Sequence, residues 1–148
     1  NMMLDVMLKA ADYQAKVSGP LLDRIDLHVE VPPVKFREMS AQAGGENSAT
    51  IRSRVIASRQ IQSKRFSGKI ACNARMQSRD LQRHCALDDS TRDLLKMAME
   101  ELDLSARAYD RILKVARTIA DLTGAESLGV EHVSEAIQYR SLDRQIWT

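Results

Sequence analysis

Arginine is the residue type whose positions in this sequence suggest chemistry, because a guanidinium group can hold a phosphate through two parallel hydrogen bonds. Arg24 lies between two aspartates, and Arg107 lies two residues after Ser105. Ser105 is a predicted helix N-cap, so Arg107 falls in a first helical turn, where free amides and the helix dipole favour an anion. Arg111 follows one turn later on the same face. The residues alone also fit ordinary ion pairs with neighbouring aspartates, so both interpretations stay open at this point.

The sequence offers few other groups for catalysis. It has no Gly-rich phosphate loop ending in Gly-Lys-Ser/Thr and no plausible nucleophile–base arrangement, so we expect the chain alone to hydrolyse no nucleotide. Cys72 and Cys85 lie outside any CxxC spacing and the three histidines share no ligand spacing, which predicts free thiols and no metal site. Unpaired cysteines favour a reducing cytoplasm, and no apolar run approaches the ~20 residues that span a bilayer. We therefore expect a cytoplasmic protein without membrane contact.

The element expected around Arg24 is a β-strand. Apolar residues alternate with polar ones from Ile25 to Val31, and Pro32-Pro33 closes the run. One strand cannot make a sheet. The strand therefore either pairs with elements outside this chain or is the edge of a larger domain.

The elements expected around Arg107 and beyond are helices. From Ser105, apolar residues recur at three- and four-residue steps to Gly124, which predicts a long amphipathic helix with one buried stripe. The members of that stripe are Tyr109, Ile112, Leu113, Ala116, Ile119 and Ala120. Further helices are predicted at 48–64, at 73–84, from 88–89 onward and at 130–139. The first of these is expected to bury Ile51, Val55 and Ile61, and the third is expected to bury Leu94, Leu95 and Met99. The sequence predicts a mainly α fold, a helical bundle over 48–140 with a tail at 141–148.

Positive charge is concentrated in the middle of the chain. The net charge is +2, yet residues 50–85 hold nine basic groups and one acidic group. Five of them are candidate contacts for a nucleic-acid backbone: Arg52, Arg59, Lys64, Arg65 and Lys69. They do not gather on one side of a helical wheel, and Phe66 is the one aromatic of the segment that could stack on a base. A surface complementary to the acidic helices of a neighbouring copy is the alternative.

Three separated segments resemble a known family. They are SGPLLDRIDLHVEV (18–31), SARAYDRILKVARTIADL (105–122) and EHVSEAIQYR (131–140). In this order they resemble the C-terminal part of magnesium-chelatase-like AAA+ ATPases, and most of all the bacterial competence-associated subfamily, whose members act on DNA as ring-shaped branch-migration helicases. The resemblance runs from about Tyr13 to Arg140. It implies that residues 1–47, with a helix, a turn, the one strand and a linker, are a remnant of a missing α/β AAA+ core and that 48–140 form the helical lid.

The resemblance also implies roles for the three arginines. Arg24 matches the family's arginine finger, which acts in trans on the ATP of the neighbouring subunit. Arg107 matches the sensor-2 arginine, which contacts the γ-phosphate in cis, and Arg111 lies in the same region as a further phosphate ligand or an ion-pair partner. ATP and Mg²⁺ are then cofactors of the full-length protein, and the chain alone is expected to hold neither. The implied partners are the missing AAA+ core, neighbouring copies in a hexameric ring, and DNA.

The function that we predict from these features is ATP-driven remodelling by a ring, with DNA as its substrate, as in a branch-migration helicase. Two alternatives stay open. One is the ATPase motor subunit of a metal chelatase, which drives insertion of magnesium into a porphyrin together with other subunits. The other is a stand-alone DNA-binding or interaction module with no nucleotide role. Under the first two, the chain is expected to be inactive by itself because the Walker A and B motifs are missing.

Overall fold

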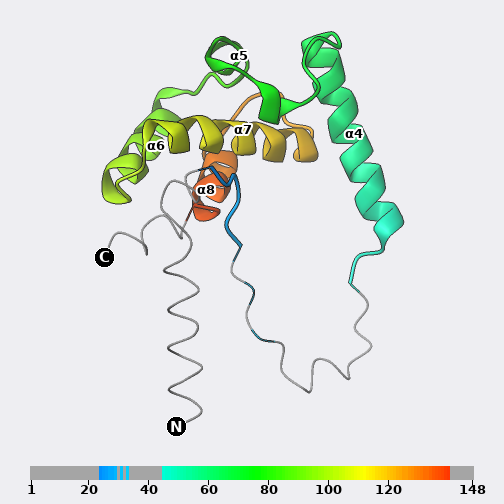
Figure 1. Cartoon of the computed structure of the whole chain (residues 1–148), viewed down its shortest axis with the longest axis horizontal. Helices are drawn as coiled ribbons and strands as arrows, with labels where there is room; N and C mark the ends of the chain where they lie inside the picture. Colours follow the sequence, from blue (N-terminus) through cyan, green and yellow to red (C-terminus); the bar gives the residue numbers. More distant parts are fainter. Residues whose placement is uncertain (1–23, 30, 32, 34–44, 141–148) are drawn as a thin grey trace.

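The computed structural model describes residues 24–29, 31, 33 and 45–140 (Figure 1). The elements in chain order are α4 (Ser48–Phe66), the 3₁₀ turn η1 (Asn73–Arg75), α5 (Ser78–His84), α6 (Asp89–Glu101), α7 (Ala106–Thr123) and α8 (Val130–Gln138). The predicted mainly α fold is confirmed. The predictions for 1–23 and for the tail at 141–148 lie outside the described residues.

Helix α7 is the central element of the bundle and matches its prediction closely. The hydroxyl of Ser105 accepts a hydrogen bond from the amide of Ala108 at 3.1 Å, and Gly124, with φ of 73°, ends the helix. Its apolar stripe is buried at Ile112, Leu113, Ala116 and Ala120. Helices α4, α5 and α8 all pack against α7, while α6 packs against α8.

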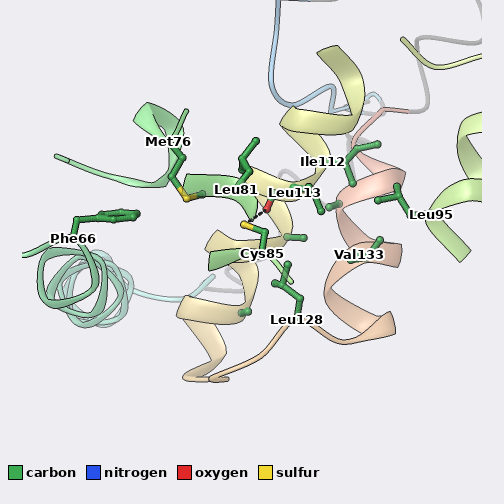
Figure 2. Close-up of a cluster of buried hydrophobic side chains, with 12 residues drawn as sticks. Phe66, Met76, Leu81, Cys85, Leu95, Ile112, Leu113, Leu128 and Val133 are labelled. Atoms are coloured by element: carbon green, nitrogen blue, oxygen red, sulfur yellow. Dashed lines mark hydrogen bonds between the residues drawn. The ribbon is translucent and has the colours of Figure 1, made fainter. Parts of the chain in front are cut away.

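The core lies where α6, α7 and α8 meet and continues under α5. Figure 2 shows Leu95, Ile112 and Val133 directed toward one another, and all three side chains are almost completely buried. Phe66 joins the same cluster from the end of α4. Tyr109, expected in this core, is instead 38% exposed, so that prediction was wrong.

Helix α4 packs only through its second half. Ser58, Gln62 and Phe66 are its buried residues, whereas Ile51 and Val55 are 41% and 47% exposed. Figure 1 shows the first half of α4 extending away from α7. The prediction that Ile51 and Val55 face inward was wrong, because the bundle does not reach along the whole helix.

The predicted helix at 73–84 is divided in two. Asn73–Arg75 form the 3₁₀ turn η1, Met76 is extended, and α5 begins only at Ser78. The amide of Gln77 donates to the carboxylate of Asp80 at 2.8 Å, which fixes the start of α5.

The predicted strand at 25–31 is not formed by its described residues. They run without strand pairing, and the amide of His28 donates to the carbonyl of Tyr139 at 2.8 Å. A strand needs a neighbouring strand to complete its ladder, and among the described residues there is none. Three of the alternating apolar side chains are therefore exposed: Leu27 at 47%, Val29 at 63% and Val31 at 80%.

Candidate functional site

Arg107 lies on the exposed face of the first turn of α7. The buried neighbours Ala108 and Ile112 fix the rotation of this helix about its axis, so the side chain at 107 is directed away from the core. The hydroxyl of Ser105 caps the helix through the amide of Ala108, and the helix dipole favours an anion at this end. The position therefore suits contact with a phosphate that approaches the end of α7 from outside the bundle.

Arg24 is exposed as well and lies in a turn at the start of residues 24–29, which we call the finger segment. Ile25 and Leu27 of this segment are partly exposed, whereas His28 is buried. The bundle therefore holds the finger segment at its later residues and leaves Arg24 at the surface. An arginine in this position is accessible to a neighbouring molecule.

Arg111 is paired inside the molecule. Its Nη1 atom donates to the carboxylate of Asp26, in an ion pair whose side chains are 25% and 50% exposed. The pair joins α7 directly to the finger segment, two residues after Arg24. Of the two interpretations open for Arg111, this contact favours the ion-pair partner.

Two further contacts hold the finger segment on the end of α8. Arg140, which is 1% exposed, donates a hydrogen bond from Nη1 to the carbonyl of Ile25. The amide of His28 donates to the carbonyl of Tyr139 at 2.8 Å. Residues separated by more than 110 positions thus meet in one place, and no local pattern in the sequence predicts these contacts.

The sequence of this chain is similar to known proteins along most of its length. Residues 45–140 match the family described as "Magnesium chelatase, subunit ChlI C-terminal", and residues 4–39 match "Magnesium chelatase, subunit ChlI". The chain belongs to the magnesium chelatase ChlI family. The resemblance to magnesium-chelatase-like AAA+ proteins inferred from the three segments is confirmed.

Relatives of this ChlI-family chain include bacterial proteins of greater length. It is 44% identical over 133 residues to "Competence protein ComM" of Haemophilus influenzae, which covers 89% of the chain and 26% of that protein. It is 41% identical to the protein YifB of Salmonella typhimurium and 40% identical to YifB of Escherichia coli, with the same coverage. The chain therefore spans about a quarter of the length of these curated relatives.

Arg65, a candidate nucleic-acid contact, has its guanidinium in the interior of this ChlI-family bundle. Its two terminal nitrogens pair with both carboxylate oxygens of Asp121, the Nη1–Oδ2 distance being 2.8 Å. Asn73 donates to the same carboxylate at 2.8 Å, and Arg117 donates to it from Nε at 3.1 Å. Because the guanidinium of Arg65 is already paired with Asp121, we remove Arg65 from the proposed nucleic-acid surface.

Arg117 is the second cation of this buried network and was not singled out from the sequence. It is 2% exposed, and it also donates to the carbonyls of Glu126 at 2.9 Å and Ala125 at 2.6 Å. Burial lowers the pKa of Arg117 from its ordinary value, and the charge of Asp121 opposes that shift. One signal was present: Arg117 follows Leu113 by four residues and Asp121 follows Arg117 by four.

The remaining candidate nucleic-acid contacts are exposed. They are Arg52, Arg59 and Lys64 on α4 and Lys69 in the loop after it. Helix α4 contains no acidic residue, although Arg54 pairs with Glu46 of the preceding loop at 2.8 Å. Burial raises the pKa of the Cys72 thiol in the following loop, but the hydrogen bond and the charge of Arg59, together with the backbone of Ala74 and Arg75, lower it by more, so that the pKa of this thiol lies below its ordinary value. Exposed basic residues therefore occur along α4 and in the loop after it, although they do not lie on one side of the helix.

A separate hollow of about 340 Å³ lies between α5, α6 and α7. Its apolar part is lined by Leu81, Cys85 and Leu113. Helix α7 also contributes Tyr109 and Asp110 to its lining. Burial raises the pKa of Cys85 to about 11, so this thiol stays protonated. In the described part of the chain no three His, Cys, Asp or Glu side chains are grouped so as to hold a metal ion, and no helix is long and apolar enough to cross a membrane.

Proposed function

We propose that this chain is the lid region of an AAA+ ATPase and that its Arg107 binds the γ-phosphate of ATP held by the core of the same protein. The observation that carries the proposal is the exposure of Arg107 in the first turn of α7, where the helix dipole favours an anion. A guanidinium there adds a charge-assisted hydrogen bond where the helix dipole is already favourable. Mg²⁺ bound with the nucleotide would neutralise part of the charge of the ATP phosphates, and Arg107 would contact the γ-phosphate from the lid.

Arg24 acts in trans in this proposal. Its side chain is exposed at the start of the finger segment and can reach a nucleotide bound by an adjacent copy in a ring. A guanidinium stabilises the charge that develops on the transferred phosphoryl group, and such fingers contribute about 10³–10⁵ in rate. We expect the ring to be a hexamer in the cytoplasm.

DNA is the substrate that we propose for the ring. Support comes from the exposed basic side chains of α4 and from the name of the Haemophilus influenzae relative, a competence protein. A second candidate, the motor of a metal chelatase, is favoured by the family description, which names magnesium chelatase over residues 45–140. A stand-alone binding module is disfavoured, because the family match and the exposed arginines point to a nucleotide.

The test is a fusion in which residues 1–148 replace the matching region of the Haemophilus influenzae relative. We expect the fusion to hydrolyse ATP with Mg²⁺, and Arg107→Ala to abolish hydrolysis while leaving the helical content unchanged. Lys114→Ala is the control, because it removes a positive charge from the same helix without touching the proposed site. Hydrolysis by Arg107→Ala at the control rate would refute the sensor role.

The trans role of Arg24 is tested in mixed rings. A subunit with Arg24→Ala keeps its own ATP site, and a subunit with Arg107→Ala keeps its finger. Each variant alone is expected to be inactive, and mixing them should restore part of the activity because intact sites then receive intact fingers. Absence of restoration would argue against action in trans.

Branched DNA separates the two candidate functions. We expect branched DNA to stimulate hydrolysis by the fusion and the stimulation to fall with rising salt, because phosphate contacts release counterions. A rate of ATP hydrolysis that is the same with and without branched DNA would favour the chelatase motor.

A further inference from the structure

We propose that Arg111 is a positioning residue that acts through Asp26 to hold the arginine finger in place. Its ion pair with Asp26, the hydrogen bond from Arg140 to Ile25 and the bond between His28 and Tyr139 together form a clamp on the finger segment. The inference rests on the proposed function, because it assigns a task to a residue near Arg24 and Arg107. It differs from the role in phosphate binding that the sequence left open for Arg111.

The ion pair of the clamp lies close to both arginines along the chain. Asp26 follows Arg24 by two residues, so their Cα atoms lie within about 7 Å of each other. Arg111 follows Arg107 by one turn of α7, about 6 Å along the helix axis. The ion pair between Arg111 and Asp26 therefore joins a residue two positions from the proposed finger to a residue one helical turn from the proposed sensor.

The three contacts of the clamp differ in burial. Arg140 is almost fully buried and uses its charge on a backbone carbonyl, and His28 is buried beside it. Asp26, in contrast, is half exposed. The buried end anchors the finger segment on α8, and the exposed ion pair sets where its first residues lie against α7.

A mechanical consequence follows from this arrangement. When Arg107 engages a phosphate, any shift of α7 is transmitted through Arg111 and Asp26 to Arg24. The nucleotide state of one subunit then sets the position of the finger that this subunit offers to its neighbour. Without the ion pair, the contacts at Ile25 and His28 are those that still hold the segment among the described residues, and Arg24 has more freedom.

The first experiment measures amide hydrogen exchange over residues 24–29 in the 148-residue chain. In Asp26→Ala and Arg111→Ala we expect exchange in this segment to become up to about fivefold faster, because loss of an exposed ion pair lets the segment open locally without global unfolding. The charge swap Asp26→Arg with Arg111→Asp should restore slow exchange, and the control Lys114→Ala should leave it unchanged. Equal exchange in all variants would overturn the clamp.

The second experiment measures kcat and KM for ATP in the fusion described above. A finger that is misplaced by about 1 Å costs up to about 100-fold in rate. We therefore expect Arg111→Ala to lower kcat with little change in KM, and the charge swap to recover much of kcat. A raised KM that the swap fails to rescue would instead make Arg111 a phosphate ligand and overturn its positioning role.

The two experiments fail in distinguishable ways. Faster exchange in the variants with unchanged kcat and KM in an active fusion would retain the clamp as a structural contact and refute its role in positioning. Loss of the exchange effect with an active, Arg107-dependent fusion would refute the clamp and keep the proposed function. An inactive fusion would contradict the proposed function, and the exchange result would still decide whether the clamp exists.

Discussion

Asp121 is the residue on which the bundle depends most strongly for its buried charges. It is 2% exposed and its carboxylate accepts hydrogen bonds from Arg65, Arg117 and Asn73. We consider the substitution Asp121→Asn, which keeps the shape of the side chain and removes its charge. Two guanidinium groups then remain at the same place with no counter-charge among the residues described.

The expected cost follows from the burial of each cation. Removing one partner of a buried ion pair costs about 3–5 kcal/mol, because the remaining charge stays desolvated. Arg117 is buried and meets this condition, although it keeps its two carbonyl acceptors; the side chain of Arg65 is 14% exposed and recovers part of its hydration. We therefore expect Asp121→Asn to lower the free energy of unfolding by about 3 kcal/mol, toward the lower end of that range.

The assay is thermal and urea unfolding followed by circular dichroism. For a domain of 60–100 residues, each kcal/mol lowers Tm by about 4–8 °C, so the expected decrease is roughly 12–24 °C. Asp89→Asn is the matched control, because Asp89 also pairs with an arginine, Arg92 at 2.6 Å, but its side chain is 95% exposed. The control should cost less than about 1 kcal/mol.

Two results would refute this reasoning. If Asp121→Asn and Asp89→Asn had equal effects, burial of the network would be irrelevant to stability. If Arg65→Met destabilised the protein more than Asp121→Asn, the argument from uncompensated charge would be wrong, because Arg65→Met leaves Asp121 paired with Arg117 and Asn73.

Three further predictions concern other parts of the chain. Ser105→Ala removes the cap of α7 and should cost about 1 kcal/mol in urea unfolding, an effect that Ser105→Asp should avoid; equal losses in both would exclude a cap. Near pH 8, Cys72 should react with a thiol reagent much faster than Cys85, because the pKa of Cys72 is lowered and the pKa of the buried Cys85 is raised to about 11. A further rise in pH should increase the reaction rate of Cys72 little once its thiolate has formed. Equal reaction rates of the two cysteines would contradict this prediction. In filter binding to DNA, replacing Arg52 and Arg59 by alanine should reduce the slope of log K against log salt by about 2, and an unchanged slope would remove them from the surface.

Local signals in the sequence predicted the helices well. The start of α7 depends on Ser105, its end on Gly124, and its buried face on apolar residues three and four positions apart. All of these determinants lie within the helix or next to it. The same holds for α6, where Asp88 accepts from the amide of Thr91 at 2.8 Å and Leu95 is buried.

Errors arose where the answer depends on distant residues. Ile51 and Val55 have helical spacing, but whether they are buried depends on how far α7 reaches along α4. Arg65 lies in a strongly basic segment, which is typical of a nucleic-acid contact, but its partner Asp121 lies 56 residues away in the sequence. The alternation around Leu27 fits a strand, yet strand formation requires a second strand that the described chain does not supply.

The candidate site shows the same division. The exposure of Arg107 follows from its place relative to the stripe of α7 and was predictable. The pairing of Arg111 with Asp26 was not, because the two residues are 85 positions apart and each has nearer residues of opposite charge. The residue types alone therefore left the task of Arg111 undecided, and only the fold brings it to the finger segment.

The two ends of α7 carry separate tasks, which makes stability and catalysis separable by mutation. Asp121 at the end of the helix binds Arg65 and so joins α4 to the bundle, while Arg111 in its first half binds the finger segment. An ion pair as exposed as that of Arg111 with Asp26 contributes about 1 kcal/mol or less, so its loss should hardly lower Tm. Arg111→Ala should therefore reduce kcat of the fusion at nearly constant Tm, whereas Asp121→Asn should reduce Tm at constant kcat well below the transition. If Arg111→Ala instead lowered Tm as much as Asp121→Asn does, its effect on kcat would be explained by loss of fold, and positioning would no longer be needed to account for it.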